Sequence, residues 1–199
     1  VGSERALLFD TAYGEGNLRE FVEEITDKPV MVVNSHGHFD HTGGNAWWEE
    51  VWAGPGAEKV AKQAFDPAMQ AAFEQKPHPD YAIHTVREGH VFDLGDRQIE
   101  VFEIPAHHES SIDRNARALY TGDEMEAGQV LLFVRDNQLP IREVISSHLA
   151  NMKKLKLYED EFDTISPAHN GPQLCKCYLD DYITLSEQIL AGTAKIMPD

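Results

Sequence analysis

The sequence predicts an α/β sandwich with a functional site along one edge, and three observations lead to that prediction. Short apolar strands alternate with amphipathic helices along the whole chain. Polar residues of the kind that hold metal ions directly follow several of these strands. The 199 residues, 42% of them hydrophobic, suffice for one domain with a sizeable core and leave little room for another. We therefore expect a single domain over residues 1–199.

The first half of the chain predicts strands that run into loops and helices. Ala6–Phe9 is a short apolar run that ends at Asp10, and apolar residues then recur at helical spacing over 18–25. Val30–Val33 is a continuous β-rich run that suits a strand buried on both faces. A short helix is expected over 45–50, a short strand over 51–53 and one or two helices over 55–75. Tryptophans 47, 48 and 52 fit a core better than a substrate pocket.

The second half predicts another sheet and two longer helices. The apolar runs 91–94 and 99–104 flank Gly95 and Asp96, which indicates a hairpin. Further strands are expected over 118–120 and 162–165, a long amphipathic helix over 141–155 and a last helix over 178–189. His148 lies on the apolar stripe of the long helix, so we expect a buried core histidine there rather than a proton donor.

Composition argues against several classes of partner. The 34 acidic and 17 basic side chains give a formal net charge of -17, which would repel a nucleic-acid backbone. No apolar run approaches the roughly 20 residues that cross a bilayer, so no membrane association is expected.

Cys175 and Cys177 are too close in sequence for an easy disulfide, and reduced thiols favour the cytoplasm.

The segment His36-Gly37-His38-Phe39-Asp40-His41 predicts a metal site. It holds three imidazoles and one carboxylate within six residues, a density of metal-ligand types that a purely structural loop rarely needs. His36 and His38 alternate as they leave a buried strand, so both can turn toward one ion. Asp40 and His41 continue around the loop toward a second ion. Two adjacent ions are therefore expected.

Further ligands are expected to follow strands in the same way. His107 follows Ile104-Pro105-Ala106, Asp123 follows Tyr120-Thr121-Gly122, and His169 follows Ile165-Ser166-Pro167-Ala168. Each is weak evidence alone, because an Asp after Gly is usually a turn residue and a lone His after a strand is usually solvated. His108 competes with His107 for the ligand role. We prefer His107 because it lies closer to its strand.

These motifs, in this order, resemble the metallo-β-lactamase superfamily. The match comprises Asp10-Thr11, the 36–41 segment with Thr42-Gly43-Gly44-Asn45, Pro105-Ala106-His107, Thr121-Gly122-Asp123 and Pro167-Ala168-His169. The resemblance covers nearly the whole chain. It implies an αββα sandwich with the metal site at one edge of its two sheets.

The resemblance also implies a ligand set and a reaction. One ion would be held by His36, His38 and His107, a second by Asp40, His41 and His169, and Asp123 would bridge them. Two zinc ions are expected, with iron or manganese as alternatives, and Asp40 and Asp123 are the predicted catalytic residues. A hydroxide between two such ions is a potent nucleophile. The expected enzyme is a hydrolase of a small ester, thioester, lactone or amide.

Two features depart from the pattern that the resemblance implies. Fifteen residues separate His107 from Asp123, where two full strands are usual, so the hairpin through Asp113-Arg114-Asn115 must be short or distorted. One or two strands usually precede the element that carries Asp10. Either these residues are missing, or a homo-oligomer covers the exposed edge of the sheet.

Other functions of the same fold remain alternatives at this stage. A glyoxalase II-like thioesterase has a similar motif but adds a helical C-terminal domain, whereas this chain ends with one helix after His169. Flavodiiron-like domains replace the second histidine of the motif, and His38 is present here. The main rival is a mononuclear iron protein resembling persulfide dioxygenases. A scaffold protein with a vestigial site is less favoured, because all seven ligand positions hold competent residues. The substrate and the proton donor are not identified by the sequence.

Overall fold

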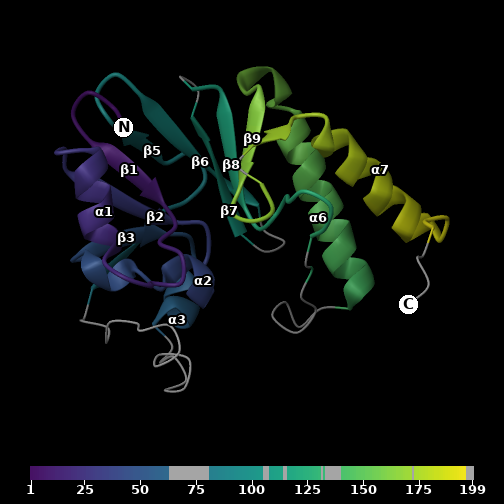
Figure 1. The fold of residues 1–199 in the computed structure, drawn as a ribbon. Helices are drawn as coiled ribbons and strands as arrows, with labels where there is room; N and C mark the ends of the chain where they lie inside the picture. The colour runs from purple at the N-terminus through teal and green to yellow at the C-terminus, as the bar shows by residue number, and fades with distance from the viewer. Residues whose placement is uncertain are drawn as a thin grey trace. The chain divides into compact units, whose positions relative to one another are not determined.

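The computed structural model describes residues 1–62, 81–104, 108–113, 116–130, 132, 140–171 and 173–195, and for 108–113 the backbone alone. Its contacts divide the chain into two compact units, Val1–Glu103 and Ile104–Asp199. Helices and strands are mixed in both units, as the predicted α/β class requires (Figure 1). The prediction of one domain over the whole chain stays a prediction.

The first unit is built on a four-stranded parallel sheet. Its strand order is β1 (Ala6–Phe9), β2 (Val30–Asn34), β3 (Glu50–Ala53) and β4 (Ala82–Thr85). Because every strand is parallel, all carboxyl ends meet at one edge of this sheet. The strand β1 is an edge strand of the sheet.

Alternate residues of these strands enter two cores, one on each face of the sheet. On one face Phe9, Met31 and Trp52 pack against the antiparallel hairpin of β5 (Val91–Asp93) and β6 (Gln98–Ile104). On the other face Val32 and Val51 pack with Tyr81 and Trp48. The expected core role of Trp48 and Trp52 is confirmed, since both are half-buried against these clusters.

Short helices complete the first unit. The helix α1 (Leu18–Ile25) begins at Asn17, whose side chain accepts a hydrogen bond from the Glu20 N–H. The chain also forms α2 (Phe39–Thr42), a 3₁₀ turn (Asn45–Trp47) and α3 (Ala57–Ala61). The helix expected over 45–50 is thus only a 3₁₀ turn, because Trp48 is already extended and leads into β3. The helices expected beyond residue 62 lie outside the described residues.

The second unit carries β7 (His108–Asp113), β8 (Ala118–Gly122), β9 (Thr164–Pro167) and β10 (Leu174–Cys175). The pairs β7–β8 and β9–β10 are antiparallel, whereas β8 and β9 are parallel. The short segment before Asp123 thus does form two strands. The strand expected over 162–165 begins two residues later, because Phe162 closes the 3₁₀ turn Glu159–Glu161.

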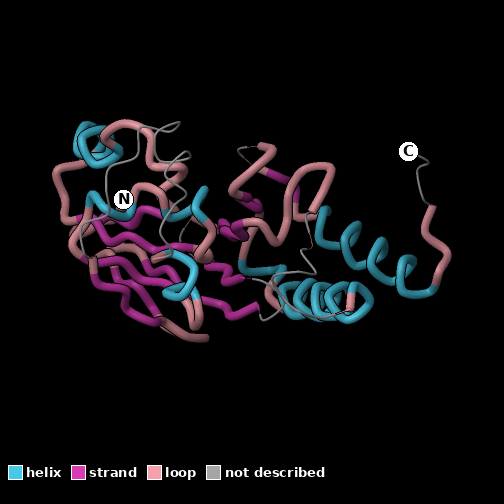
Figure 2. Tube along the Cα trace, turned by 90° about the horizontal axis from the view of Figure 1, so that it is seen from below, coloured by secondary structure: helices cyan, strands magenta, loops and turns pink. Residues whose placement is uncertain are grey.

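Two long helices pack together in the second unit, α6 (Ile141–Lys156) and α7 (Tyr178–Ala191) (Figure 2). His148 of α6 is 2% exposed, which confirms the prediction of a buried core histidine. The helix α7 ends at Gly192, whose φ of 72° is the left-handed conformation that favours glycine. Within the described residues, no helix combines the length and hydropathy that crossing a membrane requires.

Candidate metal centre

The metal-ligand candidates of the first unit lie where β1 and β2 end. Asp10 follows β1 directly, and Ser35 and His36 follow β2. The two strands are parallel neighbours with Phe9 opposite Val33, so these residues leave the sheet at the same edge. Ser35, His36 and His41 are buried, and the Asp10 side chain is 11% exposed. These four side chains are therefore largely shielded from solvent.

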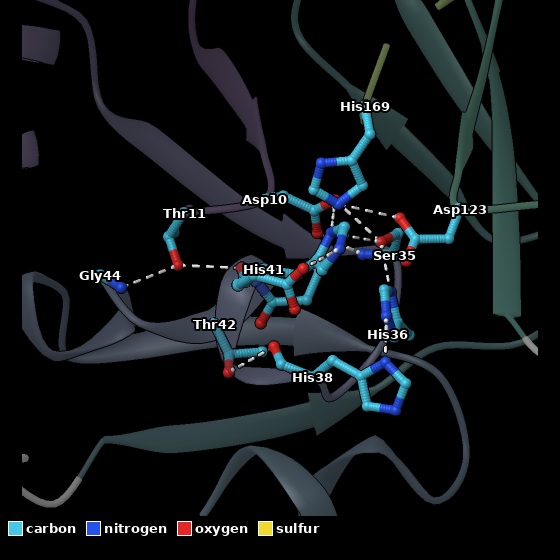
Figure 3. A network of polar contacts seen from close by, with 12 residues as sticks. Asp10, Thr11, Ser35, His36, His38, His41, Thr42, Gly44, Asp123 and His169 are labelled. Carbon is cyan, nitrogen blue, oxygen red and sulfur yellow. Dashed lines mark hydrogen bonds and ion pairs between the residues drawn. The ribbon is translucent and has the colours of Figure 1, made fainter. Parts of the chain in front are cut away.

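Asp10 organises two of the imidazoles. Its Oδ1 accepts the Ser35 N–H at 2.7 Å, and its Oδ2 accepts the Ser35 hydroxyl at 2.8 Å (Figure 3). The same Oδ2 lies 2.9 Å from His41 Nδ1. Since a carboxylate accepts only, the proton of the His41 ring sits on Nδ1. His41 Nε2 then carries the lone pair of the ring, which is the form of the atom that binds a metal ion.

Ser35 links Asp10 to His36 and fixes the protonated nitrogen of that ring as well. Its hydroxyl donates to Asp10, so its oxygen is the acceptor for His36 Nδ1 at 2.9 Å. The His36 ring then carries its lone pair on Nε2. A carboxylate that fixes the tautomer of a ligating histidine is a common support of metal sites, and here one carboxylate sets two rings.

The ligand atoms converge in two pairs. His36 Nε2 lies 2.9 Å from His38 Nδ1, and the two ring centroids are 4.5 Å apart. Asp40 Oδ2 lies 3.6 Å from His41 Nε2. In each pair, basic atoms face one another at a separation suited to sharing one cation. The donor set of imidazole nitrogen and carboxylate oxygen fits zinc or iron.

The turn that carries these ligands is held by its own backbone. The Thr42 hydroxyl donates to the His38 carbonyl at 3.0 Å, and the Thr42 N–H donates to the same oxygen at 3.1 Å. Gly37 has no room for a side chain, since a Cβ there would lie 2.7 Å from the Ala57 carbonyl oxygen of α3. The glycine between the two histidines is thus required by packing.

A buried polar cluster supports the turn from behind. The His41 carbonyl accepts hydrogen bonds from the Thr11 N–H at 2.8 Å and from Asn34 Nδ2 at 3.0 Å. Asn45 Nδ2 donates to Asn34 Oδ1 at 2.8 Å, and Asn45 Oδ1 lies 2.8 Å from the Thr11 hydroxyl. All four residues are at most 1% exposed. Fully satisfied buried networks of this kind rigidify a site.

The second unit brings Asp123 and His169 together. The parallel strands β8 and β9 end side by side, and the Ala168 N–H donates to the Gly122 carbonyl at 3.0 Å. Asp123 Oδ1 then lies 3.5 Å from His169 Nε2 (Figure 3). Beyond His169, Asn170 adopts a φ of 61° and donates through Nδ2 to Glu126 Oε2. That bond ties the two ligand-bearing loops to each other.

The loop after Asp123 rests on the helices of its own unit. The His148 ring donates through Nε2 to the Glu124 carbonyl at 3.1 Å, and burial lowers the His148 pKa. Asn151 Nδ2 donates to Glu124 Oε1 at 2.8 Å. Burial raises the pKa of the Glu124 carboxyl to about 7. Tyr182 of α7 donates to the Glu126 carbonyl at 2.6 Å.

The structure therefore pairs His36 with His38, Asp40 with His41, and Asp123 with His169, and His107 lies outside the described residues. Sequence reasoning missed the roles of Ser35 and Asp10. Asp10 belonged to the motif but had no function assigned, because its partners lie 25 and 31 positions away. Its place at the end of a strand beside β2 was the signal that could have pointed to it.

Comparison with known proteins identifies the family. The model of the metallo-beta-lactamase superfamily matches residues 1–169, and the chain belongs to this superfamily. Among curated proteins it is similar to the acyl-coenzyme A thioesterase MBLAC2 of Gallus gallus, with 30% identity over 159 residues. That match covers 65% of this chain and 57% of the relative, so the chain spans under three fifths of the relative's length.

Solved structures confirm the fold. A metallo-beta-lactamase from Pontibacter korlensis aligns with a TM-score of 0.67 and 20% identity, covering 94% of this chain and 84% of its own. A protein solved in a di-iron-bound form aligns with a TM-score of 0.62 and 22% identity. The alignment covers 85% of this chain and 83% of that protein. The predicted metallo-β-lactamase fold class is thus confirmed, and the ligand pairs described above support binding of divalent metal.

Proposed function

We propose that this chain carries the catalytic core of a divalent-metal thioesterase that hydrolyses acyl-coenzyme A. Water and the thioester would give a carboxylic acid and the free thiol of coenzyme A. The observation that carries the proposal is the pairing of ligand atoms around one organising carboxylate, Asp10. The name of the relatives, acyl-coenzyme A thioesterase, supports the choice of thioester among the substrates that a metal hydrolase could cleave.

We assign the ligands as the resemblance implies. His36, His38 and His107 would hold one ion, Asp40, His41 and His169 the other, and Asp123 would bridge the two. Zinc is the proposed metal, since it takes imidazole and carboxylate ligands and has no redox chemistry. When bound, such ions polarise the thioester carbonyl and lower the pKa of a water molecule.

The chain's own residues contribute orientation. Asp10 holds a proton on His41 Nδ1 and, through Ser35, on His36 Nδ1, so both Nε2 atoms carry the lone pairs that a metal ligand needs. The carbonyl of His41 is held by Thr11 and Asn34, which keeps the turn from rotating. This preorganisation means that substrate binding need not reorder the ligands.

The first test is metal content together with thioester hydrolysis. Elemental analysis of the chain purified without chelator, paired with thiol release from acyl-coenzyme A, should show near two zinc ions per chain and chelator-sensitive activity. His38→Ala should lose metal and activity. His84→Ala serves as the matched control, because His84 is an exposed histidine of the same sheet that pairs with Glu50.

Other outcomes would decide between the alternatives. One iron per chain without thioester hydrolysis would favour the persulfide-dioxygenase-like function. Protein that binds no metal would refute the site. Hydrolysis of lactones or β-lactams in preference to thioesters would support a metal-dependent hydrolase but reject thioesters as its substrate class.

A further inference from the structure

Two exposed aromatic side chains stand beside the ligand-bearing turn. Phe39 lies between His38 and Asp40 in the chain and is 36% exposed. Tyr13 lies three residues after Asp10 and is 39% exposed. Their ring centroids are 5.5 Å apart with the planes at 62°, an edge-to-face contact. We call Tyr13 and Phe39 the aromatic pair.

The backbone holds this pair in a fixed position. The Gly43 N–H, one residue after α2, donates to the Ala12 carbonyl at 2.9 Å. A Cβ at Gly14 would lie 2.3 Å from the Gly43 carbonyl oxygen, and a Cβ at Gly43 would lie 2.2 Å from the Tyr13 carbonyl oxygen. The two segments therefore touch backbone to backbone, which only glycine permits.

The loop before Tyr13 also adopts an uncommon conformation. Asp10 and Ala12 have φ of 64° and 53°, in the left-handed region that side chains other than glycine rarely enter. Such strain persists only where surrounding contacts outweigh it, and it gathers at functional sites. Here the compensating contacts are hydrogen bonds with the ligand turn: Asp10 accepts from His41 Nδ1, the Thr11 N–H donates to the His41 carbonyl, and the Ala12 carbonyl accepts from the Gly43 N–H. The aromatic pair is thus preorganised together with the ligands.

The surroundings favour an apolar partner for this pair. Val60 of α3, whose Cβ lies 2.8 Å from where a Gly37 Cβ would stand, is 39% exposed as well. Contiguous exposed apolar surface marks binding sites, and the adjoining rings of Tyr13 and Phe39 supply such surface at the ligand-bearing turn. Acyl-coenzyme A has an apolar acyl chain and a phosphate-rich anionic part. With a net charge of -17, the protein's general field opposes binding of the anionic part but not of the acyl chain.

We propose that Tyr13 and Phe39 bind the acyl chain of a thioester substrate next to its carbonyl and thereby select long acyl groups over short ones. The inference rests on the proposed function, whose substrate class it narrows. The two rings supply apolar contact area at low entropic cost, because their backbone is already fixed. Short acyl groups cannot reach across both rings, so they gain little from the pair.

The test compares acyl-chain length across variants. We would measure kcat/KM of metal-loaded protein for acetyl-, octanoyl- and palmitoyl-coenzyme A, below the concentration at which the last forms micelles. Phe39→Ala and Tyr13→Ala should each lower kcat/KM for palmitoyl-coenzyme A about tenfold, mainly through KM, and lower the acetyl value much less. Phe39→Leu, which keeps an apolar side chain, should retain most of the preference.

Phe21→Ala is the matched control. Phe21 lies on α1, is 59% exposed and does not belong to the aromatic pair, so its loss removes an exposed phenylalanine without touching the pair. It should leave all three substrates unaffected. Metal content of every variant would be measured to exclude damage to the ligands. An equal loss for acetyl and palmitoyl substrates, or a loss in Phe21→Ala as large as in Phe39→Ala, would overturn the inference.

A second readout separates this inference from the proposed function. Binding of a non-hydrolysable thioether analogue of palmitoyl-coenzyme A can be measured without turnover. Binding that weakens about tenfold in Phe39→Ala supports the inference even if no thioester is hydrolysed, in which case the proposed function alone fails. Analogue binding that is unchanged in both variants overturns it. A wild-type dimer that becomes a monomer in Phe39→Ala would also overturn it, because the pair would then be a contact between two copies.

Discussion

The two ligand-bearing regions of this protein are built in different ways. In the first unit, four candidate ligands lie within the six residues 36–41, and the side chains of Asp10, after β1, and Asn34, at the end of β2, hold them. In the second unit, Asp123 and His169 lie far apart in sequence and meet because β8 and β9 are parallel neighbours. The first region depends on local packing and hydrogen bonds, and the second depends on strand pairing.

This difference indicates where each region is vulnerable. The first region has backbone segments in direct contact and buried polar groups with several partners each, so single changes there should be costly. In the second region, the two ligand-bearing loops are joined to each other by the bond between Glu126 and the exposed Asn170. The following predictions test this contrast, from the largest expected effect to the smallest.

Removing the close backbone contact should have the largest effect. Gly43→Ala places a Cβ 2.2 Å from the Tyr13 carbonyl oxygen, so the loop and the turn must separate, and we expect a loss of about 3 kcal/mol in the free energy of unfolding. Gly128→Ala in the second unit meets no atom within 4 Å, and its φ of 86° alone should cost about 1 kcal/mol. Urea unfolding of both variants checks this, and equal losses would contradict the contrast.

Removing the charge of the organising carboxylate should weaken metal binding. In Asp10→Asn the amide nitrogen can face His41 Nδ1, which moves the ring proton to Nε2, the atom intended for the metal. We expect zinc affinity to fall about 10- to 100-fold. Competition with a chromogenic chelator measures this, and Asp96→Asn, an exposed aspartate of the same unit, is the control. Unchanged affinity would show that Asp10 does not set the tautomers.

Loosening the second region should have a smaller effect. Asn170→Gly removes the bond to Glu126 but keeps the left-handed backbone, and we expect a loss of about 1 kcal/mol in unfolding free energy. Asn170→Ala should cost about 1 kcal/mol more, since alanine resists a φ of 61°. Zinc affinity should fall less than in Asp10→Asn. A larger fall would mean that the second region is as finely organised as the first.

The exposed ion pair of Arg117 and Asp163, which precede β8 and β9, should contribute least to stability. Arg117 donates to both carboxylate oxygens of Asp163, and these hydrogen bonds lower the Asp163 pKa below its ordinary value of 3.8. A carboxyl group whose pKa is lowered by folding stabilises the fold at pH values above its unfolded-state pKa. This contribution disappears as the pH falls through the folded-state pKa. Arg117→Gln should therefore be slightly less stable at pH 7 and equal to the wild type at about pH 2. Unfolding curves at both pH values test this, with Arg19→Gln as the control for an exposed ion pair.

Much of the fold was predictable because its strands and helices have regular apolar patterns. The runs that became β1, β2, β3, β5, β6 and β8, and the helices α1, α6 and α7, all follow such patterns. The elements that were not predicted lack them. The strand β4 is half polar and mostly exposed, β10 spans two residues, and the turn α2 consists largely of the ligands themselves. Their conformations depend on neighbours that the local sequence does not reveal.

The sequence by itself determined the types and order of the candidate ligands and the family to which the chain belongs. Motifs a few residues long are enough to identify them. Only the tertiary structure decided how the ligands are oriented. The proton positions on His36 and His41 depend on Asp10, which lies 31 residues before His41, and on the register that sets β1 beside β2. Hydrogen bonds act over about 3 Å, so a contact between such distant segments exists only once the strands have paired.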